Sequence, residues 1–177
     1  MLNLWDTGGG GEDYPRLRPL SYPGTDVLCL CFDITNRRSF DNIKTHWMPE
    51  FNQYCPDVPI ILVGNKIDLR QDQDVLTRLF EEGKTVVSTD EGHLLAAEIN
   101  AAKYMETSAC TSEGVKEVFF EAFLIFNRKL ENYYKKVSRE YQKNYIHFLE
   151  NTHKHTHTHT HTHTSYKAHN VLLIVYT

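Results

Sequence analysis

The sequence has few cysteines, and none of them stand at the paired spacings typical of zinc ligands or of a disulfide framework. The four are Cys29, Cys31, Cys55 and Cys110. Cys29 and Cys31 alternate within an apolar segment, a pattern that indicates buried thiols in a reducing compartment. We therefore expect a cytoplasmic protein and not a disulfide-stabilised secreted one.

Long hydrophobic runs are missing as well. The amino terminus lacks a basic start followed by an apolar stretch and a cleavage site, so no signal peptide is indicated. The apolar run at 171–175 is far shorter than the roughly twenty residues that a membrane span needs, and we expect residues 165–177 to form a disordered tail. With 177 residues, 41% hydrophobic residues and a net charge of −4, the chain fits one soluble core.

A complete phosphate-binding loop, Gly-x-x-x-x-Gly-Lys-Ser/Thr, is also missing from the sequence. Gly83-Lys84-Thr85 resembles the end of such a loop, but Arg78 stands at the first glycine position and no buried strand precedes it. In a P-loop, backbone N–H groups and the lysine carry most of the phosphate charge, and the hydroxyl holds Mg²⁺. We therefore expect this chain to hold a nucleoside triphosphate poorly.

What is present is an alternation of strand and helix patterns. Short continuous apolar runs at 27–32 and 60–63 are typical of strands covered on both faces of a parallel sheet. Ser39 is the expected cap of an intervening helix, which Pro49 should bend or end. A second helix should open at Thr89, and 103–106 should form a short final strand. This order predicts an open α/β sheet, in which ligands bind outside the carboxyl ends of the strands.

A polar segment, Asn65-Lys66-Ile67-Asp68, follows the strand at 60–63. The Asp68 carboxylate can accept two hydrogen bonds from the ring N–H and the exocyclic amine of guanine, whereas adenine would present an acceptor to it. The Lys66 stem can lie over the base, and Asn65 can tie neighbouring loops together. An Asn-x-x-Asp turn is also common as plain loop chemistry, so these residues alone leave both interpretations open.

Four further segments are candidate sequence motifs. They are Asp6-Thr7-Gly8-Gly9 after an apolar strand, residues 12–23, Trp47-Met48-Pro49-Glu50, and Thr107-Ser108-Ala109-Cys110. In order and spacing over residues 2 to about 130, they resemble a Rho-family small GTPase of the Ras superfamily from its third strand onward. They correspond to that family's Asp-x-x-Gly motif, switch II, Trp-x-Pro-Glu signature and Ser-Ala guanine loop.

The resemblance implies a fold, a function and a set of binding residues. The fold would be a partial Ras-like G domain of the α/β class, a mostly parallel sheet flanked by helices, without its first strands and P-loop. The function would be that of a GTP/GDP- and Mg²⁺-binding switch with GTPase activity, in signal transduction to the cytoskeleton. Effector and regulator proteins would bind residues Tyr14 to Tyr22. The implied nucleotide-binding residues are Asp6, Thr7, Gly8, Gly9, Asn65, Lys66, Asp68, Ser108, Ala109 and Cys110, with Asp6 approaching the magnesium through water.

Departures from the family pattern predict impaired nucleotide binding and hydrolysis. The family's first strand is central in its sheet, so two strand edges should lose their shared neighbour. One residue is inserted after Asp6, and the glutamine that orients the attacking water is replaced near Gly10 and Gly11, so no catalytic residue is assigned. No cysteine follows Cys110, and we expect no prenylation box and no lipid anchor.

The expected layout is a partial G domain at 1–131 with a solvated inserted helix at about 70–88, a helical extension at 132–152, and a His-Thr repeat at 153–164 before the tail. The extension's aromatic and basic residues could contact RNA or a membrane, but its alternating charges favour a solvated helix, and no nucleic-acid partner is predicted. The repeat could chelate a metal, but a CA dinucleotide repeat in DNA encodes the same pattern. Two alternative functions stay open, a pseudo-GTPase module presenting switch II and a metal-binding histidine tract.

Overall fold

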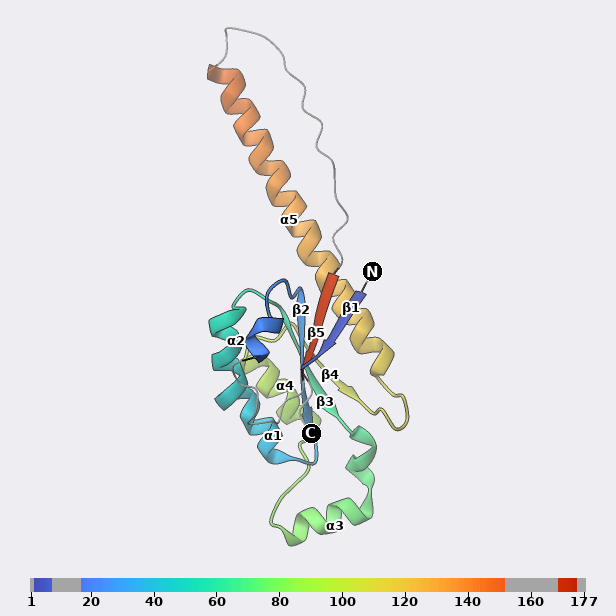
Figure 1. Ribbon diagram of the computed structural model, residues 1–177. Coiled ribbons are helices and arrows are strands. Elements are labelled where there is room, and N and C mark those ends of the chain that lie inside the picture. The colour runs from blue at the N-terminus through green and yellow to red at the C-terminus, as the bar shows by residue number, and fades with distance from the viewer. Residues whose placement is uncertain (1, 8–16, 152–168, 175–177) are drawn as a thin grey trace. The chain divides into compact units, whose positions relative to one another are not determined.

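The computed structural model describes residues 2–7, 17–151 and 169–174. A parallel sheet of five strands lies at its centre, in the order β1-β5-β2-β3-β4 (Figure 1). The strands are β1 (Leu2–Asp6), β2 (Val27–Asp33), β3 (Ile60–Asn65), β4 (Lys103–Thr107) and β5 (His169–Ile174). The predicted α/β class with a mostly parallel sheet is confirmed.

Strand β2 is buried along its whole length, as its continuous apolar run predicts. Leu28, Leu30 and Phe32 belong to a core cluster that also takes in Phe51, Leu95 and other buried side chains of the helical segments that cover the sheet. Cys29 and Cys31 alternate with them and are also buried, as predicted from the sequence. Burial raises the pKa of the Cys29 thiol to about 12, so this thiol is unreactive in the folded chain.

The helical segment between β2 and β3 differs from the sequence expectation in its cap and its course. Asn36, and not Ser39, caps α1 (Arg37–Asn42), because the Asn36 side chain accepts a hydrogen bond from the Ser39 backbone N–H at 3.2 Å. The helix widens into a π-helical turn, η2 (Ile43–Trp47), and then continues as α2 (Met48–Tyr54). Pro49 thus does not end the helix. The wide turn lies just before Pro49, which has no backbone N–H to donate.

Helix α4 (Thr89–Glu98) begins as its sequence predicts. Ser88 and Glu91 form a complete capping box, in which each side chain meets the other residue's backbone N–H. Helices α1, α2 and α4 lie on one side of the sheet, and the first turns of α5 (Val115–Asn151) lie on the other (Figure 1). The short 3₁₀ helices η1 (Arg18–Ser21) and η3 (Ile67–Gln71) and the helix α3 (Gln73–Glu81) complete the described elements.

Strand β5 corrects two expectations from the sequence. Residues 165–177 were expected to be a disordered tail, yet His169–Ile174 forms a strand. The edges of β1 and β2 were expected to lack a shared neighbour, yet β5 pairs with both of them. The physical reason is that a segment inserted between two strands gains backbone hydrogen bonds on both sides, a long-range gain that local sequence patterns do not report.

Two compact units divide the chain. One comprises residues 1–125 with 168–177, and the other comprises residues 126–167. The part of α5 that lies in the second unit carries exposed aromatic side chains, including Tyr133 and Tyr141. None of the helices in the described part of the chain has the length and hydrophobicity of a membrane span.

Candidate functional site

The carboxyl ends of β3 and β4 bring two of the predicted site segments together. Asn65 ends β3 and stands level with Thr107, which ends β4. The Thr107 hydroxyl donates a hydrogen bond of 2.7 Å to Oδ1 of Asn65. Asn65 therefore ties two loops together, which is the role that the sequence suggested for it.

Asp68 and Ser108 meet directly at this edge. The Ser108 hydroxyl donates to Oδ1 of Asp68, and Oγ of Ser108 in turn accepts the Thr111 backbone N–H at 3.1 Å. Ser108 is fully buried, while Ala109 and Cys110 lie exposed in the turn that follows. A carboxylate fixed at the end of a buried strand offers a charged acceptor to a base with paired N–H groups.

Lys66 has a partner that the sequence analysis missed. Its backbone takes a left-handed conformation with φ of 66°, and its ammonium group lies 2.7 Å from Oδ2 of Asp33, the last residue of β2. Asp33 is only 5% exposed, and its other oxygen accepts hydrogen bonds of 2.7 Å from the backbone N–H and the hydroxyl of Thr35. Lys66 thus neutralises a buried carboxylate while its stem crosses the strand ends.

A second group of residues holds the loops behind this edge. Arg70 forms a two-pronged ion pair with Glu106, with bonds of 2.8 and 2.7 Å, and the Tyr104 hydroxyl donates to Glu106 at 2.8 Å. Burial acts to raise the pKa of Glu106, but the hydrogen bonds from Arg70 and Tyr104 lower it below its ordinary value. Because Arg70 follows Asp68 and Glu106 precedes Ser108, this ion pair fixes the two loops against each other. Because Arg70 and Glu106 are far apart in the sequence, no local pattern predicts that they form an ion pair.

Asp6 stands apart from this edge. It is level with Leu173 of β5 and through it with Cys29 of β2, whereas Asn65 is level with Asp33. That offset in register corresponds to about 13 Å along the strands. Thr7 has a buried hydroxyl oxygen with no hydrogen-bond partner, and the predicted Gly8, Gly9, Gly10 and Gly11 lie outside the described residues. The residues that the sequence predicts to contact the base therefore lie together, and Asp6 lies apart from them.

The described residues do not fit a protein-held metal site. No group of three or more His, Cys, Asp or Glu side chains in that part of the chain could hold an ion. Asp6 is an exposed single carboxylate at the end of an edge strand. The histidine tract at 153–164 lies outside the described residues.

The described part of the predicted switch II segment, residues 17–22, is anchored by the Trp-x-Pro-Glu signature. The buried Tyr22 donates its hydroxyl to Glu50, and Arg18 lies 3.5 Å from the same carboxylate and 4.5 Å from the ring centre of Trp47. Burial, together with the Glu50 carboxylate, raises the pKa of the Tyr22 hydroxyl, which stays protonated. Leu17 and Leu20 remain exposed, at 55% and 74%. Residues 14–16 lie outside the described residues.

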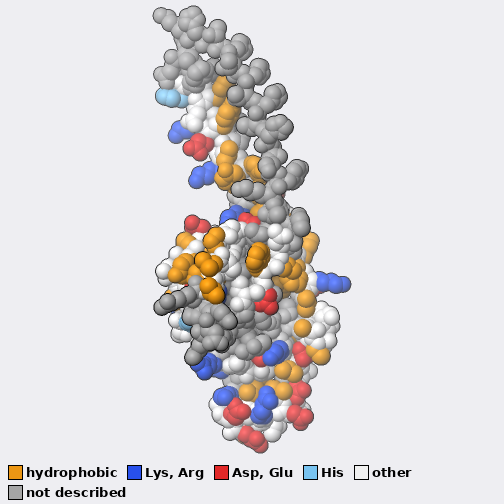
Figure 2. All heavy atoms as spheres, in the orientation of Figure 1, with side chains coloured by type: hydrophobic (Ala, Val, Ile, Leu, Met, Phe, Trp, Pro, Cys, Tyr) orange, Lys and Arg blue, Asp and Glu red, His pale blue; other side chains and the backbone are white. Residues whose placement is uncertain are grey.

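Other features of the molecule are weaker candidates for a site. Gly83-Lys84-Thr85 follows α3 and not a strand, which agrees with its rejection as a P-loop. Acidic and basic side chains gather around α3, as expected for a solvated insert (Figure 2).

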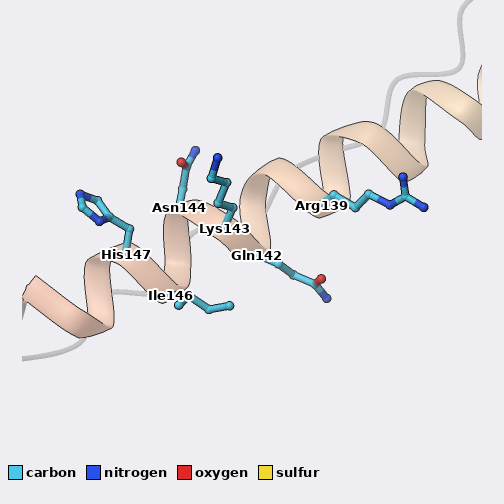
Figure 3. A pocket seen from close by; sticks show the side chains of 6 residues that line it. All are labelled: Arg139, Gln142, Lys143, Asn144, Ile146 and His147. Carbon is cyan, nitrogen blue, oxygen red and sulfur yellow. The ribbon is translucent and has the colours of Figure 1, made fainter.

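A cavity of about 600 Å³ is lined by Arg139, Gln142, Lys143, Asn144, Ile146 and His147. These side chains leave one stretch of α5 in different directions and do not converge on one point (Figure 3).

A parallel α/β sheet with a polar cluster at the carboxyl ends of its strands is the architecture of the Ras-like class of domains. A family model described as "Ras family" matches residues 1–128. The Rho-related GTP-binding protein RhoB of Homo sapiens, Mus musculus and Rattus norvegicus is 53% identical over 118 residues, which are 67% of this chain and 60% of each relative. The chain belongs to the Ras family, and the relatives named here are of its Rho type. It spans about 60% of the length of these curated relatives.

Proposed function

We propose that this chain is a Rho-type guanine-nucleotide-binding domain whose base-reading half is formed by Asn65, Lys66, Asp68 and Ser108. The observation that carries the proposal is the junction of Asp68 with Ser108 and of Asn65 with Thr107 at one sheet edge. Relatives named as GTP-binding proteins support the same ligand class. Asp68 would accept the ring N–H and exocyclic amine of guanine, and the Lys66 stem would cover the base.

The phosphate half of the site is the weaker part of this proposal. The sequence contains no complete P-loop, and Asp6, which would approach Mg²⁺ through water, is offset from the base-reading edge. Magnesium, when bound with nucleotide, would neutralise phosphate charge. We therefore propose impaired binding and hydrolysis of GTP by these 177 residues, and a signalling role toward the cytoskeleton for the switch of which they form a part.

The proposal is tested by titrating the chain with guanosine, GDP and ADP, with fluorescent GDP as the tracer. We expect GDP to bind more tightly than ADP, and guanosine to bind within about tenfold of GDP, because the base would supply most of the binding free energy. Equal binding of GDP and ADP would contradict guanine reading. Sub-micromolar GDP affinity would contradict the impaired phosphate half.

Asp68→Asn separates base reading from general folding. The amide keeps the size of the side chain but replaces an anionic double acceptor with one acceptor and one donor. We expect GDP affinity to fall by about ten- to a hundredfold, with a small change in ADP affinity. Asp72→Asn is the matched control, because Asp72 caps α3 away from the strand edge. Unchanged GDP affinity in Asp68→Asn would remove the assignment.

A second candidate function is an interaction module that presents switch II. The observation that favours it is the anchoring of residues 18–22 on Glu50 and Trp47, which leaves Leu17 and Leu20 exposed. Such a module would bind effector or regulator proteins without nucleotide. Leu20→Asp would abolish binding of the partner protein while nucleotide selectivity stays unchanged. If the unmutated chain binds its partner protein only when nucleotide is present, the nucleotide switch is favoured instead.

A further inference from the structure

The sheet contains a position that only the carboxyl-terminal segment fills. Within the described residues, β1 has no ladder partner except β5, in the register Leu2 with His169 through Asp6 with Leu173. The opposite edge of β5 pairs with β2, from Val27 with Val171 to Leu30 with Ile174. Figure 1 shows the red strand β5 between the two blue strands.

The edge of β2 that β5 covers lies in the best-buried part of the fold. The four β2 residues in register with β5 are each 0% exposed. Backbone N–H and C=O groups in such a position have no water to replace a lost strand partner. A strand must therefore occupy this position for the sheet to hold β1.

The segment that fills the position has the composition that the position requires. Its residues 171–174 are Val-Leu-Leu-Ile, without charge, proline or glycine, and β2 meets them with Val-Leu-Cys-Leu. Both pairings are parallel, so a donor needs no hairpin turn and can come from a distant part of the chain. Main-chain bonds supply affinity in such strand addition, and apolar side chains supply selectivity.

We propose that the gap between β1 and β2 is a strand-binding site, that its occupant is the chain's own segment 169–174 with its apolar residues 171–174, and that the bound strand can leave and be replaced in trans by the same segment. This inference does not depend on nucleotide binding. It assigns a ligand class, a parallel extended apolar peptide, to the interior position of the sheet next to the edge strand β1.

The full-length chain offers three cysteines as reporters of the site. Cys29 is level with Leu173, so loss of β5 would uncover it. Cys55, at the end of α2, is buried away from the gap and reports general unfolding, and the exposed Cys110 reports reagent quality. The measurement is the rate at which a maleimide labels each cysteine, read by peptide mass spectrometry.

Leu172→Pro in the full-length chain removes a backbone donor from the middle of β5. A proline inside a regular hydrogen-bonded element shifts the equilibrium against that element by about a hundredfold. We therefore expect the rate of Cys29 labelling to rise by about the same factor. Leu172→Val is the matched control, since it keeps the donor and suits a strand. Unchanged Cys29 labelling in Leu172→Pro would overturn the proposal.

A synthetic peptide of residues 168–177, added to the Leu172→Pro chain, then tests exchange. We expect it to restore Cys29 protection, and a peptide with Leu172 and Leu173 replaced by Lys to have no effect. If Cys55 also becomes reactive in the variant, restoration of both cysteines by the peptide supports the site in the same way. Failure of the peptide to restore Cys29 protection overturns it.

Discussion

Gly114 shapes the loop that follows Ser108. Its backbone φ is +70°, and a Cβ at this position would lie 2.1 Å from the carbonyl oxygen of Glu106. The neighbouring Glu113 carbonyl accepts the Ser108 backbone N–H at 2.9 Å. A side chain at 114 would therefore push directly on the residues that position Ser108.

We expect Gly114→Ala to destabilise the chain by about 2–4 kcal/mol, from left-handed backbone strain together with overpacking. Urea unfolding measures the loss. Gly83→Ala is the matched control, because Gly83 also has positive φ, at +65°, but has open space around its Cβ position. The control should lose about 1 kcal/mol, and equal losses for the two variants would contradict the predicted clash.

Glu106 holds the loops of the proposed guanine site in place but does not itself contact the base. Glu106→Gln keeps the size of the side chain but weakens one bond to Arg70 and replaces the other with an NH₂ group facing a donor, so the loops that carry Asp68 and Ser108 become less fixed. We expect a loss of stability of about 1.5–3 kcal/mol. GDP and ADP affinities should fall together by several-fold, in contrast to Asp68→Asn, and a selective loss of GDP binding would contradict this positioning role.

The sequence predicted the residues of the site that belong to contiguous motifs. Asn65, Asp68 and Ser108 each follow a recognisable strand, and the parallel sheet brings strand ends together. Asp33 and the Arg70–Glu106 pair were not predicted, because their partners lie about thirty residues away along the chain. Charged residues are common on surfaces, so only the fold reveals which of them pair.

At the scale of elements, one ion pair joins α1 to the start of α4. Arg37 lies 2.7 Å from Glu91, which also belongs to the Ser88 capping box. The bond from Arg37, followed by bonds from Ser88, lowers the pKa of Glu91 from its ordinary 4.5 to about 2. A carboxylate whose pKa is lowered by folding stabilises the fold above its ordinary pKa, and this contribution is lost as the pH falls from about 4.5 toward 2.

We expect Glu91→Gln to flatten the fall of stability with decreasing pH in that window. The Glu91 side chain is 38% exposed, so solvent screening limits the effect to about 0.2–1 kcal/mol, and high salt should reduce it further. Urea unfolding at about pH 7 and about pH 3 measures the difference. Glu98→Gln, which removes an exposed pair with Lys44, is the control, and an unchanged pH slope in Glu91→Gln would contradict the prediction.

Elements with local signals were predicted, and elements that depend on distant partners were not. The helix opening at Thr89 was predicted because its opening residues Thr-Asp-Glu and the apolar spacing after them lie within one short segment. The apolar run at 171–175 was interpreted only by its length, which is too short to span a membrane. Its role in the sheet depends on β1, at the opposite end of the sequence, and no local pattern carries that information.

At the scale of the whole molecule, the two compact units differ in what stabilises them. Residues 1–125 with 168–177 enclose a core in which Phe32, Phe51 and Leu62 are buried. The described residues of the second unit are helical and mostly exposed. A helix without a buried face unfolds gradually, whereas a packed core unfolds cooperatively.

The two tryptophans allow these behaviours to be measured separately. Trp47 is 3% exposed in the core, and Trp5 is 55% exposed on β1, so Trp5→Phe leaves a fluorescence signal from the core alone at little cost in stability. In this variant we expect one cooperative urea transition by Trp47 fluorescence, preceded in circular dichroism by a gradual loss of helix from residues 126–151. Superimposable curves from the two probes would instead mean that the outer part of α5 shares the stability of the core.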